Sequence, residues 1–288
     1  YRQYERAAAS PVLVTDRMPP MDAPHLAQDV HVSGRASVRT CIDLRLQRRA
    51  RRALRRHVGA LAGDGVHGGA VVVIENDTGA VRCLIGAPDF HDREHAGQVN
   101  CARAWRSPGS ALKPFTYALA LERGLITPAT RLGDVPRAFG SYEPQNYDQA
   151  FRGPVRADRA LSHSLNVPAV ALLARVGADR LYTLLAEVGV EVPAPAAEYG
   201  LALTLGAGEV RLLDLTNAYA TLARLGLHRP CRLLADTPVA DGTRVLDAGA
   251  CFLVAEMLTD LERVGNGVLW KSARSQMRMA WKTGTSWG

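Results

Sequence analysis

The sequence predicts an α+β protein in which a mixed antiparallel sheet, flanked by helices, lies next to an all-helical lobe. Three observations predict it. A strong β-hairpin signal lies near the N-terminus, helical patterns dominate residues 107–265, and an alternating strand-like run lies at 277–285. Sheet elements at both ends of a chain with helices between them are typical of a sheet beside a helical lobe.

The composition is that of a folded globular chain. Of the 288 residues, 47% are hydrophobic and 22% are charged, which allows a large core and argues against disorder. The length fits one large or two smaller domains, and no apolar run approaches the 18 residues of a transmembrane helix. The net charge of +7 favours anionic surroundings. No basic patch interleaved with aromatic residues indicates nucleic-acid binding.

The first elements are a linker, a strand and a helix. Residues 1–37 are polar and aperiodic and begin with Tyr1, so we expect a linker or an interface to a missing N-terminal part. Val38–Ile42 predicts a short strand, and Asp43 is a good N-cap for a helix over Leu44–Leu61. Arginines cover most of that helix, which leaves open a solvated face or contact with an anionic lipid or polymer.

The remaining elements follow from turn and periodicity signals. Gly69–Glu75 and Val81–Gly86 flank Asn76-Asp77-Thr78-Gly79, which predicts a hairpin. We therefore expect a domain over 38–288, with sheet elements at about 38–90 and 277–288 and a helical lobe at about 107–265. The expected helices are 110–123, 154–165, 168–176, 211–224 and 247–263, and the last strand is Met277–Thr285.

Lysine is scarce in this chain. Only Lys113, Lys271 and Lys282 are lysines among the 35 basic residues. Arginine does not lose its proton in a protein, whereas a lysine can be tuned toward neutrality and act as a base. The few lysines are therefore candidates for roles that arginine cannot fill.

The first motif, Ser107-Pro108-Gly109-Ser110-Ala111-Leu112-Lys113, places a hydroxyl and an amine three residues apart. Gly109 is expected to break the chain so that Ser110 lies in the first turn of the following helix, on the same face as Lys113. The helix dipole and a neighbouring cation would lower the pKa of the lysine toward that of a usable base. By itself this motif is weak evidence, because serine and lysine are commonly three residues apart on ordinary helices.

Two more motifs follow. Ser164-Leu165-Asn166 ends one helix, where helix capping is the ordinary interpretation. Lys282-Thr283-Gly284-Thr285-Ser286 closes the alternating run, and Gly284 lets another backbone approach closely. The set Ser-x-x-Lys, Ser-x-Asn and Lys-Thr-Gly, in this order, is the signature of penicillin-binding proteins and class A β-lactamases.

From about Val38 to its end, the chain resembles the transpeptidase domain of class A (bifunctional) penicillin-binding proteins, above all the 1C subtype. The segments that carry this resemblance are 69–79, 106–115, 164–170, 217–221 and 282–288. It implies the penicillin-binding transpeptidase and serine β-lactamase-like fold. It also implies a periplasmic enzyme, anchored to the inner membrane through a missing N-terminal segment, that cross-links peptidoglycan stem peptides and is inhibited by β-lactams.

The resemblance implies a catalytic role for each motif residue. Ser110 attacks the carbonyl of the penultimate D-alanine to form an acyl-enzyme, and Lys113 takes the proton of its hydroxyl. Ser164 relays a proton to the leaving amine, and Lys282 supplies positive potential beside it. Asn166 holds the substrate amide.

The resemblance assigns substrate binding to the Lys-Thr-Gly segment. Thr283 and Thr285 bind the terminal carboxylate beside Gly284, and the N–H groups of Ser110 and Thr285 form the oxyanion hole. No metal or organic cofactor is implied. His91-Asp92-Arg93-Glu94-His95 carries potential ligands, but it lacks the H-E-x-x-H spacing and reads as a solvated loop. The five cysteines show no metal-ligand spacing.

In the resembling family, two further strands and a closing helix follow the Lys-Thr-Gly strand, whereas this sequence stops at Gly288. We therefore expect missing C-terminal strands, and a chain that acylates poorly or not at all because its last strand lacks a pairing neighbour.

Two other functions stay open. A serine β-lactamase shares the three motifs but needs a glutamate that activates water. Glu187, Glu191 and Glu198 lack the Glu-x-x-Leu-Asn setting. A non-catalytic β-lactam sensor or scaffold domain would also keep the motifs.

Overall fold

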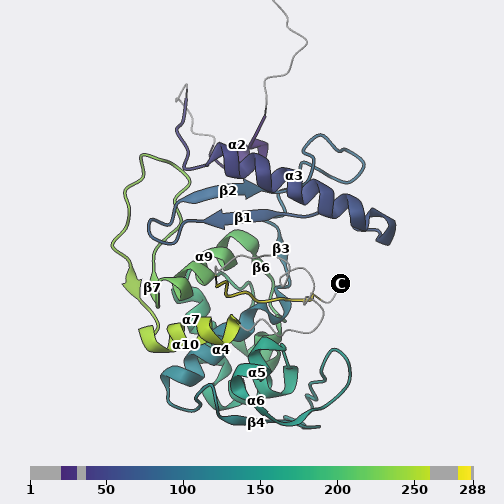
Figure 1. The fold of residues 1–288 in the computed structure, drawn as a ribbon, viewed down its shortest axis with the longest axis vertical. Coiled ribbons are helices and arrows are strands. Elements are labelled where there is room, and N and C mark those ends of the chain that lie inside the picture. The colour runs from purple at the N-terminus through teal and green to yellow at the C-terminus, as the bar shows by residue number, and fades with distance from the viewer. Residues whose placement is uncertain (1–20, 31–36, 260–277, 287–288) are drawn as a thin grey trace, which may run out of the picture.

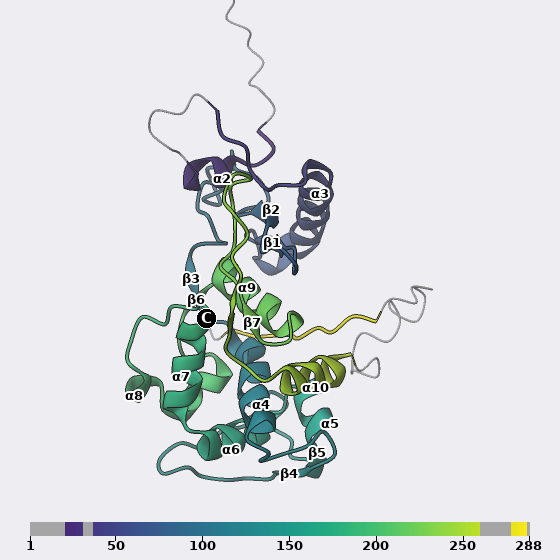
Figure 2. The same ribbon diagram turned by 90° about the vertical axis from the view of Figure 1, so that its left-hand side faces the viewer.

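A short hairpin and a helical lobe form the two ends of the molecule. The computed structural model describes residues 21–30, 37–259 and 278–286. The hairpin strands β1 (Val71–Ile74) and β2 (Val81–Ile85) lie between helix α3 (Leu44–Leu61) and helix α9 (Leu212–Ala223) (Figure 1). Turned by 90°, the hairpin and α3 lie at one end and the lobe at the other (Figure 2). The chain therefore has the predicted mixture of helix and sheet.

The N-terminal elements follow the local sequence closely. Helix α3 has the predicted bounds because the Asp43 carboxylate accepts the N–H groups of Arg45 at 2.8 Å and Leu46 at 3.0 Å. In the hairpin, Val73 pairs with Cys83 across antiparallel strands. Gly79, with φ of +71°, turns the chain where a side chain would be strained.

One expectation for this region is wrong. Val38–Ile42 forms no strand, because it makes a single bridge, Thr40 to Leu234, rather than a ladder. The segment expected to be a linker or an interface to a missing N-terminal part contains a short helix, α2 (Pro24–Asp29), whose Leu26 is buried against β2. Residues 1–20 and 31–36 of that segment lie outside the described residues.

Helix α4 (Lys113–Glu122) is the centre of the helical lobe. Its residues from Lys113 to Ala120 are all buried, so it is surrounded by other elements. The surrounding helices are α5 (Ala157–Ser162), α6 (Asn166–Val176), α7 (Ala178–Glu187) and α10 (Ala248–Leu258). Smaller helical turns are η1 (Ala62–Asp64), η2 (Gly109–Leu112), α8 (Ala196–Tyr199) and η3 (Gly200–Leu205).

Several predicted helices have different bounds. The helix expected over 154–165 is confined to α5, because residues 153–156 form strand β5 (Gly153–Arg156), paired with β4 (Arg131–Asp134). Helices α7 and α8 were not predicted. Helix α10 begins one residue after the predicted start, because Asp247 is its N-cap and accepts the Ala250 N–H. Residues 260–263 of that expected helix lie outside the described residues.

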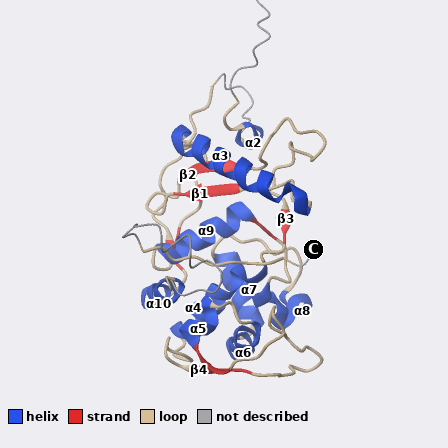
Figure 3. Cartoon of the chain, turned by 45° about the vertical axis from the view of Figure 1, so that its right-hand side comes forward, coloured by secondary structure: helices blue, strands red, loops and turns tan. Residues whose placement is uncertain are grey.

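The C-terminal strand prediction is wrong for residues 278–285. This segment runs past α9 and the top of the lobe (yellow in Figure 1) but forms no ladder with any described strand. The backbone N–H of Trp281 donates to the Leu258 carbonyl oxygen at 3.2 Å instead. Met277 lies outside the described residues. The expected single sheet is replaced, among the described residues, by four two-stranded sheets, so strands are a minor part of the fold beside the helices (Figure 3).

The short sheets beyond the hairpin connect distant parts of the chain. Strand β3 (Trp105–Arg106) pairs with β6 (Val210–Arg211), and β7 (Leu227–His228) pairs with β8 (Thr243–Arg244). The β3–β6 pair brings the start of the Ser-x-x-Lys segment beside the start of α9. Within the described ranges, no helix is both long enough and apolar enough to cross a membrane.

Candidate active site

Ser110 lies in a tight turn at the entrance to the central helix. The turn is the 3-10 helix η2 (Gly109–Leu112), and α4 begins only at Lys113. The expectation that Ser110 sits in the first turn of an α-helix is therefore wrong in detail. Gly109 has φ of +54°, a conformation that favours glycine, and it redirects the chain into this turn.

Three glycines let three chain segments meet beside Ser110. A Cβ on Gly109 would lie 2.2 Å from the Thr285 carbonyl oxygen, and one on Gly284 would lie 2.4 Å from the Pro108 oxygen. A Cβ on Gly206 would lie 2.2 Å from the Gly109 nitrogen. The Lys-Thr-Gly segment is thus packed directly against the serine turn, at a spacing that only glycine permits.

Lys113 is completely buried, with 0% of its surface exposed. Its ammonium group donates to three oxygens: Ser164 O at 2.5 Å, Ser164 Oγ at 3.3 Å and Asn166 Oδ1 at 2.6 Å. Burial, followed by the positive charge of Lys282, holds the pKa of Lys113 well below its usual value. The predicted effect of a neighbouring cation is therefore present, but desolvation is the larger cause.

Ser164 is the residue on which both motif lysines converge. Lys282 Nζ donates to Ser164 Oγ at 2.8 Å and also to the Thr283 carbonyl oxygen. Ser164 has φ of +60°, an uncommon conformation for a serine. It lies two residues after the end of α5, and its N–H donates to Leu161 O at 3.0 Å. This left-handed turn directs its hydroxyl toward the two lysines, so the strain falls at the site.

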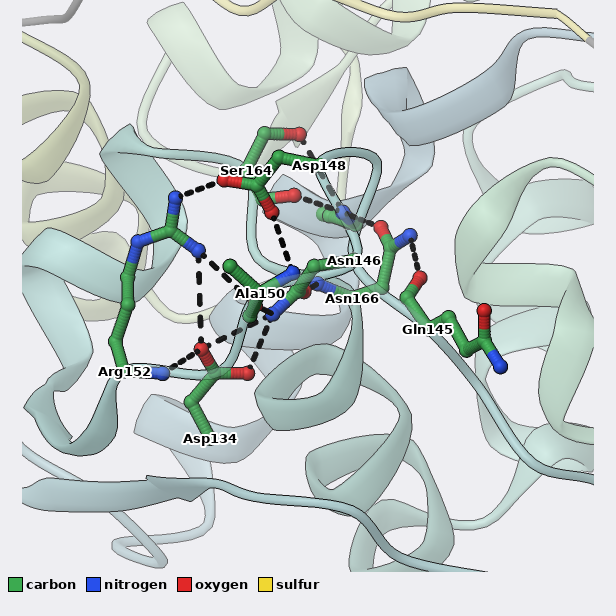
Figure 4. A network of polar contacts seen from close by, with 9 residues as sticks. Asp134, Gln145, Asn146, Asp148, Ala150, Arg152, Ser164 and Asn166 are labelled. Carbon is green, nitrogen blue, oxygen red and sulfur yellow. Dashed lines mark hydrogen bonds and ion pairs between the residues drawn. The ribbon is translucent and has the colours of Figure 1, made fainter.

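Asn166 begins α6 and is held on three sides (Figure 4). Its side-chain oxygen accepts from Lys113, and its Nδ2 donates to Gln145 O at 2.6 Å. Its backbone N–H donates to Asn146 Oδ1 at 2.8 Å. The amide is thus fixed in one orientation, with its oxygen toward Lys113.

The hydroxyl of Ser110 is not part of this hydrogen-bond network. Among the described contacts, Lys113 and Ser110 are joined by the backbone: the Lys113 N–H donates to the Ser110 carbonyl oxygen. Thr283, Gly284 and Thr285 are exposed. The structure therefore brings Lys113, Ser164, Asn166 and Lys282 into direct contact, with Ser110 and the Lys-Thr-Gly backbone beside them.

Some residues of the site were not found by sequence reasoning. Asn146 and Asp134 support Asn166, and Ser107 donates its hydroxyl to Gly206 O at 2.8 Å. No local pattern distinguishes Asn146 from an ordinary loop asparagine. In the part of the chain that the structure describes, no three His, Cys, Asp or Glu side chains are grouped to hold a metal ion. In the 91–95 loop, His95 bonds Asp92 at 2.9 Å and stacks on His67.

Comparisons with known proteins identify the fold and the family of this chain. The fold is that of a penicillin-binding transpeptidase: the structure of the penicillin-binding protein PonA1 from Mycobacterium tuberculosis superposes with a TM-score of 0.66 at 23% identity, over 82% of this chain and 67% of that one. A family model described as the penicillin binding protein transpeptidase domain matches residues 69–287. The chain belongs to this family.

Two curated relatives fall in the same family. The chain is 34% identical to penicillin-binding protein 1C of Escherichia coli (strain K12), over 99% of this chain and 37% of the relative. It is 30% identical to penicillin-binding protein 1F of Bacillus subtilis (strain 168), over 75% of this chain and 30% of the relative. The chain thus spans about a third of the length of these relatives. Membership of this family is consistent with a role in peptidoglycan cross-linking and cell-wall synthesis.

Proposed function

We propose that this chain carries the active site of a serine-type D,D-transpeptidase that cross-links peptidoglycan stem peptides ending in D-Ala-D-Ala. The observation that supports it best is the convergence of Lys113 and Lys282 on the Ser164 hydroxyl, at 3.3 and 2.8 Å, beside the Ser110 turn. We further propose that residues 38–288 belong to this transpeptidase domain, and that the protein acts in the periplasm, anchored to the membrane by a segment before it.

In the proposed reaction, Ser110 Oγ attacks the carbonyl carbon of the penultimate D-alanine while Lys113 accepts the hydroxyl proton. A lysine whose pKa is lowered by burial is suited to this role. Lys113 exchanges one of its three oxygen partners for the Ser110 hydroxyl during this step. The C–N bond then breaks, and Ser164, beside Lys282, passes a proton to the departing D-alanine amine.

The substrate is held by the residues around this relay. Asn166 binds the substrate amide, and the hydroxyls of Thr283 and Thr285 bind the terminal carboxylate where Gly284 leaves room. The N–H groups of Ser110 and Thr285 stabilise the oxyanion. An amine of a second stem peptide then attacks the acyl-enzyme, forms the cross-link and releases Ser110. β-Lactams inhibit by acylating the same serine.

Ser110 is the proposed nucleophile. Ser110→Ala is expected to abolish labelling by a fluorescent penicillin, because no other hydroxyl takes the acyl group, while circular dichroism stays that of the wild type. Ser286→Ala, which removes a hydroxyl just outside the Lys-Thr-Gly core, serves as the control and keeps labelling. Undiminished labelling of a folded Ser110→Ala protein would overturn the assignment.

The lifetime of the penicillin adduct separates this function from its alternatives. A transpeptidase or a sensor keeps the adduct for long, whereas a β-lactamase hydrolyses it quickly because a positioned base activates water. Release of D-alanine from a stem-peptide analogue then separates an enzyme from a sensor. Mass spectrometry over time after mixing with penicillin measures the first property, and a D-alanine assay measures the second.

A further inference from the structure

One asparagine, Asn146, is buried in a mostly exposed loop. The loop over residues 135–152 joins β4 to β5, and only Pro144 and Asn146 in it are buried. Asn146 is 5% exposed, and its amide is bonded on both sides. Its Oδ1 accepts the Asn166 N–H, and its Nδ2 donates to Ala150 O at 2.8 Å and to Asp134.

Asp134 is the buried end of this chain of contacts (Figure 4). It is the last residue of β4 and is 0% exposed. Its two carboxylate oxygens lie 2.8 and 3.0 Å from Asn146 Nδ2, and one of them accepts the Arg152 N–H at 3.0 Å. A carboxylate only accepts hydrogen bonds. It therefore forces the Asn146 amide to turn its NH2 group toward Asp134 and its oxygen toward Asn166.

We propose that Asp134 is a positioning residue that acts through Asn146 on Asn166 and Lys113. The order of contacts is Asp134 to Asn146, Asn146 to the Asn166 N–H, and Asn166 Oδ1 to Lys113 Nζ at 2.6 Å. The expected effect on acylation rests on the proposed function, but the order of contacts is testable without that function. Asp134 itself does not touch substrate.

The test variant is Asp134→Asn, which keeps the size of the side chain. The new asparagine replaces one carboxylate oxygen with an NH2 group. In either orientation this NH2 group faces another donor, either the Asn146 NH2 or the Arg152 N–H. The Asn146 amide is then no longer held, and Asn166 and Lys113 lose their fixed geometry. We expect acylation by penicillin at saturating concentration to fall by about ten- to a hundredfold, the scale of small displacements in an active site, with a smaller change in half-saturating concentration.

Exchanging the side chains of Asp134 and Asn146 distinguishes an effect on Asn166 and Lys113 from a general loss of order in the loop. Asn146→Asp alone places a second carboxylate against Asp134 and is expected to acylate most slowly. The double variant Asp134→Asn with Asn146→Asp restores a donor–acceptor pair and an acceptor for the Asn166 N–H, so it is expected to acylate faster than Asn146→Asp alone. Equal rates for these two variants would contradict the proposed order of contacts.

Two control variants leave the contacts intact. Tyr117→Phe removes a buried hydroxyl near Asp134 that has no hydrogen-bond partner among the described residues. Asp148→Asn disrupts the exposed ion pair to Arg152 in the same loop, 2.6 Å long, without touching Asn146. Both are expected to acylate at wild-type rates. Loss of acylation in either as large as in Asp134→Asn would mean that any damage to this region lowers activity.

A spectroscopic measurement decides the inference even if the proposed function fails. The chain has only three lysines, so lysine labelled with 13C at Cε yields three signals, assigned by Lys→Arg variants. Asp134→Asn is expected to shift the Lys113 signal, whereas Tyr117→Phe leaves it in place. The Lys113 signal does not depend on acylation, so this test of the positioning role holds even if penicillin does not acylate the wild-type protein. An unmoved Lys113 signal in folded Asp134→Asn overturns the positioning role.

Discussion

Lys113 differs from an ordinary lysine because its ammonium group is buried yet fully bonded. Three oxygens from Ser164 and Asn166 satisfy its three donors, while burial and Lys282 oppose its charge. An arginine at this position would keep a positive charge but has no accessible neutral form. The residue therefore combines structural and chemical demands that only lysine meets.

The substitution Lys113→Arg separates charge from proton transfer. We expect acylation to slow by about two to four orders of magnitude, the usual effect of losing a general base, because guanidinium does not accept the Ser110 proton. Stopped-flow acylation by penicillin measures it, with Lys271→Arg, outside the three motifs, as control. A loss below about tenfold in a folded variant would mean that Lys113 contributes only its charge.

The lowered pKa of Lys113 also predicts how stability depends on pH. Between the pKa in the folded protein and the ordinary lysine pKa of about 10.4, the unfolded chain binds a proton that the folded chain does not. The contribution of Lys113 to the free energy of unfolding therefore rises with pH over this window and is smallest below the folded pKa.

The variant Lys113→Met isolates this contribution. We expect the wild type to gain stability relative to Lys113→Met as the pH is raised from about 7 to about 10. Urea unfolding of both proteins at several pH values measures the difference, and other titrating groups cancel because both proteins contain them. A difference that stays constant with pH would show that the pKa of Lys113 is not lowered by folding.

At the scale of elements, the site depends on the approach of three irregular segments rather than on one sheet. The η2 turn, the residue after η3 and the Lys-Thr-Gly segment meet at Gly109, Gly206 and Gly284. Gly206 also caps η3 in the left-handed conformation, with φ of +87°. A side chain at any of these positions must push the serine turn away from its neighbours.

Gly206→Ala is expected to lower acylation by more than about tenfold, because its Cβ would lie 2.2 Å from the Gly109 nitrogen and displace Ser110. Gly65→Ala is the matched control. Gly65 caps η1 in the same left-handed conformation, with φ of +79°, but its Cβ would meet nothing within 4 Å. Both variants bear the left-handed strain, about 1–2 kcal/mol, so thermal unfolding should show a common loss. Equal acylation by the two variants would refute the displacement.

At the scale of the whole molecule, α9 joins two hydrophobic clusters. Leu213, at the start of α9, belongs to the cluster around the hairpin with Leu26, Val81 and Leu84. Farther along the helix, Leu215, Ala218 and Leu222 belong to the larger cluster of the lobe. The hairpin end and the lobe therefore share one rigid element.

Leu213→Ala is expected to destabilise both ends, by about 2–5 kcal/mol for a large-to-small core substitution, because α9 loses its anchor in the hairpin cluster. Amide hydrogen exchange should show lower protection in β2 and also in α10, which packs on α9. Leu26→Ala, in the same cluster but on α2 rather than α9, should lower protection in β2 only. Unchanged protection of α10 in Leu213→Ala would show that the two ends open independently.

Elements that depend on local interactions, and the motifs themselves, could be predicted from the amino-acid sequence. Helix α3 and the hairpin could be predicted because a cap, a turn and a hydrophobic period lie within a few residues of each other. The order of the three motifs, with lysines scarce elsewhere, was enough to indicate the family.

How the motifs meet depends on long-range contacts. The contact between Lys113 and Ser164 joins residues 51 apart, and that between Lys282 and Ser164 joins residues 118 apart. Asn146 and Asp134 enter the site through hydrogen bonds that no local pattern encodes. The strand expected at the C-terminus fails for the same reason: an alternating pattern makes a strand possible, but it does not supply the partner strand with which a ladder forms.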